Sequence, residues 1–145
     1  MRRRAKLFPK EVFISHAHRD RAFVTRLIQV LQAHHIKYWY SPKHIVGAQA
    51  WHDEIGKALV RCDWFMLVLS PQAVKSKWVV HEYFYAFDTD RYTGRIVPVL
   101  YKPCRWERLS WTLRRFQWVN FDRDFDAGCF ALLKTWGIQL QKGRC

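Results

Sequence analysis

The feature that most constrains the fold of this chain is its alternation of short apolar runs with segments of helical periodicity. The run Trp64–Leu69 is apolar at every position, as expected of a central strand covered on both faces. Further strands are predicted at 11–15, 36–40, 96–101 and 118–121. The strand 96–101 contains Pro98, so it is expected towards a sheet edge or with a local irregularity. Helices are predicted from a cap at Asp20 to about His34 and over 50–61, 78–87 and 125–136. This order predicts an α/β flavodoxin-like fold, an open parallel sheet of about five strands (order 2-1-3-4-5) with helices on both faces.

The length and composition fit a single buried core. The chain has 145 residues, of which 50% are hydrophobic and 17% aromatic, enough for one domain without staples. We expect a basic N-terminal tail over residues 1–10 and a single domain over 11–140. No apolar run approaches the ~20 residues of a membrane span, and no signal-peptide segment follows the first residues. We therefore expect a cytoplasmic protein with no membrane partner. The four cysteines include no C-x-x-C pair, so neither a zinc site nor a disulfide framework is expected.

The formal net charge of +13 raises the question of an anionic partner. The excess is regional. Residues 1–10 carry five basic groups and 134–145 carry three, with no acidic group in either, while 102–115 carry five basic groups and one acidic group. Residues 11–101 are nearly balanced, with 11 basic and eight acidic groups. A basic tail could hold phosphates without sequence preference, but no recognised DNA- or RNA-binding motif accompanies it. We expect no specific nucleic-acid partner.

The predicted sheet places a ligand crevice beyond the carboxyl ends of its first and third strands, where the winding direction switches. Ser15 and His16 follow the first of these strands, and Ser70 follows the third. Neither strand end carries the acidic residues of a phosphoacceptor receiver domain, and no glycine-rich loop of dehydrogenase type follows the first strand. The seven histidines show no convincing ligand pair, so we expect no metal.

Four segments occur in an order typical of one family. They read V-F-I-S-H-A-H-R-D (12–20), W-Y-S-P-K-H-I (39–45), F-M-L-V-L-S-P (65–71) and S-K-W-V-V-H-E (76–82). Together they resemble the TIR (Toll/interleukin-1 receptor) domains of bacterial type. The second segment, followed by Gly47, resembles the BB loop of that family. The fourth resembles the S-x-W-x-x-x-E motif that bears the catalytic glutamate of the NAD-cleaving members.

The resemblance implies that Glu82 is catalytic. Trp78 stands four residues earlier on the same predicted helix face, where its indole can wall a pocket around the carboxylate. Cleavage of the nicotinamide–ribose bond passes through an oxocarbenium-like sugar, and the leaving group is already cationic. A single carboxylate can therefore serve as electrostatic stabiliser, hydroxyl acceptor or nucleophile. From position alone, Glu82 would be expected on an exposed helix surface.

The resemblance implies substrate-binding roles for further residues, namely Phe13, Ser15, His16, Trp39, Lys43, His44, Ser70 and Trp78. For several of these a purely structural role is as good an interpretation. Ser15 and His16 could form a simple strand-to-helix turn, Trp39 could pack in the core, and the two loop cations could be solvated. NAD+ is expected as a substrate, and no cofactor is expected.

Two functions follow from the resemblance. The first is a TIR-type NAD+ nucleosidase that releases nicotinamide and either ADP-ribose or a cyclic ADP-ribose signal, in bacterial anti-phage defence. It would be activated by self-assembly into a homo-oligomer through the BB loop, with other TIR or effector proteins as further partners. The alternative is a non-catalytic TIR interaction module that recruits other TIR proteins.

Overall fold

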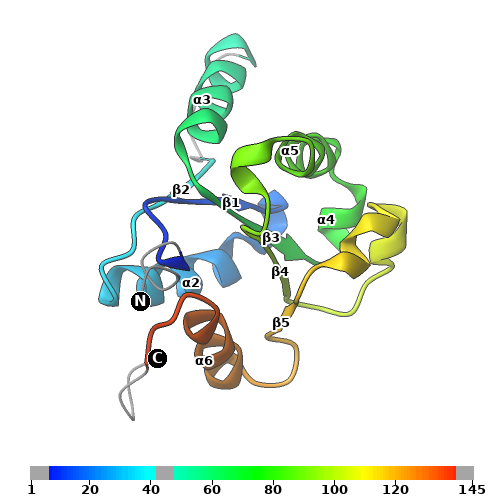
Figure 1. Ribbon diagram of the computed structural model, residues 1–145. Coiled ribbons are helices and arrows are strands. Elements are labelled where there is room, and N and C mark those ends of the chain that lie inside the picture. The colour runs from blue at the N-terminus through cyan, green and yellow to red at the C-terminus, as the bar shows by residue number, and fades with distance from the viewer. Residues whose placement is uncertain (1–6, 42–47, 140–145) are drawn as a thin grey trace.

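The computed structural model describes residues 7–41 and 48–139, and these residues contain one five-stranded sheet. The strands are β1 (Val12–Ser15), β2 (Tyr38–Tyr40), β3 (Trp64–Leu69), β4 (Ile96–Leu100) and β5 (Val119–Asn120). All four strand pairs are parallel, and the order is β2-β1-β3-β4-β5 (Figure 1). The predicted fold class and strand order are confirmed. The winding direction switches between β1 and β3.

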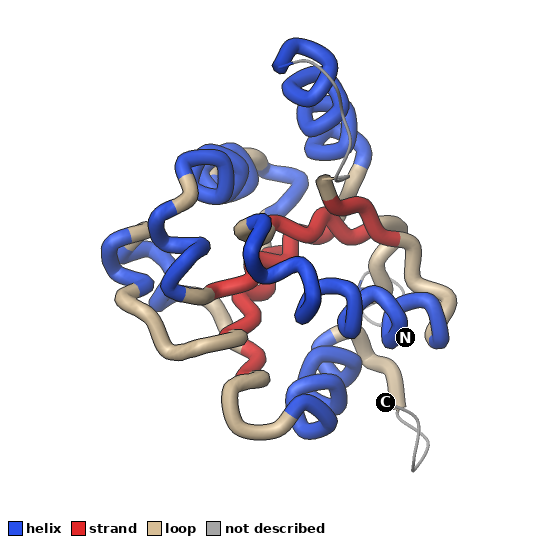
Figure 2. Tube along the Cα trace, turned by 180° about the vertical axis from the view of Figure 1, so that it is seen from behind, coloured by secondary structure: helices blue, strands red, loops and turns tan. Residues whose placement is uncertain are grey.

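Helices cover both faces of the sheet. They are α2 (Arg21–Ala33), α3 (Ala48–Arg61), α4 (Pro71–Lys75), α5 (Lys77–Phe87) and α6 (Phe125–Thr135), with 3-10 turns η1 (His18–Asp20), η2 (Asp90–Tyr92), η3 (Trp106–Arg108) and η4 (Trp111–Arg115). Helices α2 and α6 lie on one face, and α3, α4 and α5 lie on the other (Figures 1 and 2). The short helix α4 was not predicted from the sequence. Ser70 caps it by accepting a hydrogen bond from Ala73 N at 3.0 Å, and Ser76 then caps α5.

The strands are buried on both faces, which explains why their apolar residues follow one another without alternation. In β1, Ile14 belongs to the core cluster under α2 and α6, whereas Phe13 belongs to the cluster under α3 and α5. In β3, Met66 and Leu67 divide between the two clusters in the same way. Strands β1 and β3 therefore each contribute to two hydrophobic layers.

Pro98 is tolerated because of where its missing N–H would point. The carbonyl of Leu100 accepts a hydrogen bond from Phe121 N at 2.9 Å, so the backbone polar groups of Leu100 point towards β5. Pro98 lies two residues earlier in β4, and its backbone faces the same side. The pairing between these two strands includes only Val99 and Leu100 of β4, so Pro98 lies before it begins. Strand β4 is the neighbour of the short edge strand β5, in agreement with the predicted position towards an edge.

Gly128 in α6 allows the helix to pack tightly against Phe121. A Cβ atom at this position would lie 2.4 Å from Phe121 Cδ1, closer than carbon atoms approach. Phe121 is itself buried and cannot move away freely. We expect Gly128→Ala to lower the free energy of unfolding by about 1–3 kcal/mol, the usual cost of overpacking. The measurement is urea unfolding followed by circular dichroism, with the exposed Ala127→Gly exchange on the same helix as a reference.

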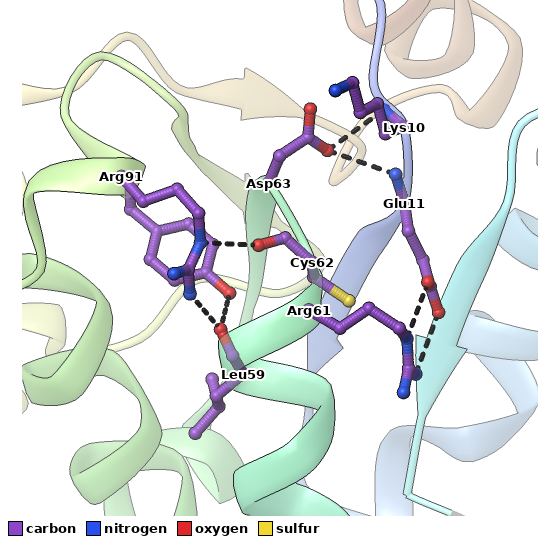
Figure 3. Close-up of polar contacts among 8 residues, drawn as sticks. Lys10, Glu11, Leu59, Arg61, Cys62, Asp63 and Arg91 are labelled. Carbon is purple, nitrogen blue, oxygen red and sulfur yellow. Dashed lines mark hydrogen bonds and ion pairs between the residues drawn. The ribbon is translucent and has the colours of Figure 1, made fainter.

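The amino ends of β1 and β3 are joined by a polar network (Figure 3). Asp63 Oδ1 accepts hydrogen bonds from the backbone N–H groups of Lys10 (3.0 Å) and Glu11 (3.1 Å), and its Oδ2 accepts one from Arg95 (3.2 Å). Arg61 in turn binds the Glu11 carboxylate through two nitrogens, at 2.8 and 3.0 Å. One buried carboxylate thus ties together three segments at the end of the sheet opposite the crevice.

Candidate functional site

Two buried carboxyl groups meet the carboxyl ends of β1 and β3. Ser15 ends β1 and donates a hydrogen bond from Oγ to Glu82 Oε1 on α5, at 2.7 Å. Ser70 follows β3 and donates a hydrogen bond from Oγ to Asp20 Oδ2 in η1. Each serine therefore binds a carboxyl group from the segment that follows the other strand. This crossed arrangement joins the two sides of the predicted crevice.

Glu82 is only 6% exposed although it lies on a helix. Burial raises the pKa of its carboxyl group from 4.5 to about 7, and the hydrogen bond from Ser15 opposes part of this rise. The expectation from position alone, an exposed surface glutamate, is therefore wrong. A buried carboxyl group with a pKa near neutrality and one fixed hydroxyl partner is typical of functional sites.

Asp20 was expected to cap α2, and this expectation is wrong. Its side chain makes no capping hydrogen bond but is buried against Ser70. Burial raises the pKa of Asp20, while the bond from Ser70 and the charge of Lys102 lower it in part. Because the Ser70 hydroxyl also caps α4, the pair fixes η1 against the helix that precedes α5.

Trp78 lies at the beginning of α5 and is 42% exposed. It therefore stands at the surface of the site, one helical turn from the buried Glu82. Its ring meets that of Trp51 edge-on, with centroids 4.1 Å apart. The Trp51 indole N–H donates to Ser41 Oγ at 2.7 Å, and Arg21 donates to the Ser41 carbonyl at 2.5 Å. These contacts connect the residue after β2 with the first turn of α5.

His16 lies beside Tyr40, with ring centroids 6.0 Å apart. Its Nε2 is buried and has no hydrogen-bond partner among the described residues. Burial, followed by the charge of Arg21, lowers the pKa of His16 to about 4, so the imidazole is neutral at pH 7. The Nε of Arg21 is likewise buried and unpartnered within residues 7–41 and 48–139. Two unused nitrogen groups therefore lie where β1 turns into α2.

The remaining predicted site residues are Phe13, Trp39, Lys43 and His44, and the structure describes only the first two. Phe13 is fully buried and stacks on Trp39 at 5.0 Å between centroids, so it supports that half-buried indole from the core. Whether Trp39 also stacks on a ligand stays a prediction. Lys43 and His44 lie outside the described residues, and their predicted roles remain predictions as well.

Three residues of this region were not singled out as site residues from the sequence. They are Asp20, which the sequence indicates only as a helix cap, together with Arg21 and Trp51, which lie in predicted helices. Their partners Ser70 and Ser41 lie 50 and 20 residues away along the chain from Asp20 and Arg21. No local pattern reports such contacts. The one available signal was the position of Asp20 at the end of the first of the four segments, with Arg21 directly after it.

Comparison with known families decides the identity of the fold. The family described as the TIR domain matches residues 12–133. The chain belongs to the TIR domain family. The resemblance carried by the four sequence segments is thereby confirmed. Members of this family associate with one another and with other TIR proteins, or cleave NAD+, so membership alone leaves both predicted functions open.

This TIR domain is also similar to a solved structure, the TIR domain of the Toll-related receptor TRR-2 from Hydra magnipapillata. The TM-score is 0.70, and the match covers 88% of this chain and 98% of that one. At 20% sequence identity the likeness shows the fold alone. No curated protein sequence matches this TIR domain.

Two further findings concern ligands and membranes. In the part of the chain that the structure describes, no three or more histidine, cysteine or acidic side chains gather where they could hold a metal ion. Within the same residues, no helix has the length and apolar character needed to cross a membrane.

Proposed function

We propose that this TIR domain is an NAD+ nucleosidase that cleaves the nicotinamide–ribose bond, with Glu82 as the catalytic group. The observation that carries the proposal is a buried carboxyl group at the crevice, held by the hydroxyl of Ser15. A glutamate placed there for stability alone would be a poor choice, because burial disfavours its charged form. The resemblance of 76–82 to the glutamate-bearing motif of NAD-cleaving members supports the same assignment.

Cleavage of the nicotinamide–ribose bond needs one negative charge beside the sugar. As the bond to nicotinamide breaks, the electron pair leaves with the neutral base and positive charge develops on the ribose. A carboxylate in a poorly hydrated site stabilises that charge strongly, since little water screens it. The exposed part of Trp78 offers a flat apolar surface for the nicotinamide ring or the adenine. Water would give ADP-ribose, and an internal nucleophile of the substrate would give a cyclic product.

The wider proposal is a bacterial, cytoplasmic enzyme of anti-phage defence that becomes active when copies assemble through the BB loop. The test is incubation of the protein with NAD+ at high protein concentration or with a crowding agent, followed by chromatography. Nicotinamide together with ADP-ribose identifies a hydrolase, and nicotinamide with a cyclic isomer identifies a cyclase. The second candidate is a non-catalytic interaction module, and the absence of nicotinamide under every assembly condition would select it.

The raised pKa of Glu82 predicts a pH dependence for the proposed reaction. The carboxylate is the active form, so nicotinamide release should rise with pH through a midpoint near 7. Ser15→Ala removes the hydroxyl that favours the charged form, and a hydrogen bond to a charged group is worth about 1.5–3 kcal/mol. The midpoint should therefore move upward by about one pH unit or more. Rates of nicotinamide release between pH 5 and about 9 provide the measurement.

Thr25→Ala is the control for this pH profile, because Thr25 is an exposed hydroxyl residue on α2 that binds only its own helix backbone. Its midpoint should equal that of the wild type. A midpoint that stays near 7 in Ser15→Ala as well would show that Glu82 does not control the profile.

A further inference from the structure

The connection between β4 and β5 forms a basic surface with one exposed aromatic ring. It runs over residues 101–118 without a long helix, and connections of this length in compact domains are usually functional or disordered. This one is ordered into the turns η3 and η4, drawn yellow in Figure 1 on the same face of the sheet as α5. We call its exposed part the arginine–tryptophan surface, which consists of Arg105, Arg108, Trp111, Arg114 and Arg115.

Each of the two turns holds exposed members of this surface at a spacing of three residues. In a 3-10 helix, residues three apart lie on the same side. Arg105 and Arg108 have this spacing across η3, and Trp111 and Arg114 have it in η4. The Arg115 guanidinium lies over the Trp111 ring, 5.8 Å from its centroid. Trp111 is nevertheless 66% exposed, so much of the indole remains open to a ligand.

Buried hydrogen bonds hold the surface in place from beneath. The Thr112 hydroxyl interacts with the hydroxyls of Tyr83 on α5 at 2.7 Å and Ser110 at 2.6 Å. The Trp118 indole N–H donates to the Leu113 carbonyl at 2.9 Å. Leu113 itself is fully buried in the core under α5. The exposed arginines therefore stand on a fixed base.

Three of the four guanidinium groups of this surface have no partner among the described residues. Among the described residues, the side chains of Arg105, Arg108 and Arg114 make no hydrogen bond, ion pair or ring contact. Other arginines of the described residues do have side-chain partners, as Arg61 has with Glu11 and Arg95 has with Asp63. The one acidic residue within 102–115 is Glu107. Four exposed guanidinium groups within one short connection repel each other and gain from an anionic partner.

We propose that the arginine–tryptophan surface binds single-stranded nucleic acid without sequence preference. Guanidinium groups pair with phosphates through two nitrogens, and an exposed indole stacks on any base. A protein partner is less well matched, because the core of a protein interface needs several apolar side chains. This surface offers only one. The proposal is independent of NAD+ cleavage.

The experiment is fluorescence anisotropy with the full chain and a fluorescein-labelled oligothymidylate of about 12 nucleotides, within the usual site size of single-strand binders. Binding should weaken as salt rises, with a log–log slope of about −2 to −3 if three or four phosphates are contacted. Arg108→Gln/Arg114→Gln should reduce that slope by about 1.4 and weaken binding roughly tenfold or more at low salt. Trp111→Ala should weaken binding about tenfold and leave the slope unchanged.

The control is Lys37→Gln/Arg123→Gln, which removes the same charge from exposed positions outside this surface. It should bind the oligothymidylate nearly as tightly as the wild type. Equal losses in the two double variants would overturn the proposal, because binding would then depend on net charge or on the basic tail. The proposal also fails if polyglutamate competes as well as the oligothymidylate and Trp111→Ala binds normally, an outcome that identifies an acidic protein as the partner.

Discussion

Glu82→Gln should lower the rate of nicotinamide release from NAD+ by at least about 100-fold while the protein stays folded. The exchange keeps the size of the side chain and an oxygen that can accept the bond from Ser15. It removes the negative charge that the developing sugar cation requires, and losing one such electrostatic contact in an active site costs about 10²–10³ in rate. The measurement is the initial rate at pH 8, where the wild-type group is mostly ionised.

Glu54→Gln is the matched control, since Glu54 is an exposed glutamate that pairs with Lys57 on the surface of α3. Its rate should remain within about twofold of the wild type, as expected of a surface site. Equal rates in Glu82→Gln and Glu54→Gln would remove Glu82 from the mechanism. They would leave the NAD+ cleavage itself, if observed, to be explained by another group.

The same variant carries a prediction for stability. The pKa of Glu82 is raised in the folded state, so its protonated form is favoured there, and this contribution is complete below pH 4.5 and lost as pH rises through about 7. Glu82→Gln does not ionise. Its free energy of unfolding relative to the wild type should therefore increase by about 3 kcal/mol between pH 4.5 and pH 8. Urea unfolding at the two pH values measures this double difference.

Asp63→Ala should lower the free energy of unfolding by about 3 kcal/mol, because it leaves two backbone N–H groups and one guanidinium without their partner. The carboxylate is buried, and these groups are partly buried with it. For a domain of this size, the loss corresponds to a fall in Tm of about 10 °C. Thermal unfolding followed by circular dichroism gives the value.

Two further variants serve as controls for Asp63→Ala. Asp63→Asn keeps an oxygen for the N–H groups of Lys10 and Glu11 but loses the charge that faces Arg95, so it should lose only part of the stability. Glu107→Ala removes an exposed carboxylate and should change stability by no more than about 0.5 kcal/mol. If Asp63→Ala resembled Glu107→Ala, the network at the amino ends of the strands would contribute nothing measurable.

The fold was predictable because its signals are local. The apolar run Trp64–Leu69 coincides with β3, and the helical spacing after Asp20 matches α2. Helix α4 was missed because it has only five residues, too few to show a helical period. The order of the strands followed from the general rules of parallel α/β sheets.

The candidate site was predictable only in part. Glu82 was found through a motif, whereas its burial depends on packing between α5 and β1 that no local pattern reports. The carboxyl group of Asp20 could accept a hydrogen bond either from the first turn of α2, as a helix cap, or from a hydroxyl group distant in the sequence. The helix cap was expected. The distant partner prevailed because Ser70 lies at the neighbouring strand end in the folded sheet.

Two consecutive residues of α5 form hydrogen bonds with two different segments of the chain. Glu82 is bonded to the end of β1, and Tyr83 is bonded to Thr112 in the β4–β5 connection. A rotation of this helix would therefore change both bonds. The position of the carboxylate is thus set by a balance between the sheet and a surface segment remote from the crevice. Variants of Thr112 should therefore shift the carboxyl group of Glu82, the proposed catalytic group, without changing any residue at the ends of β1 and β3.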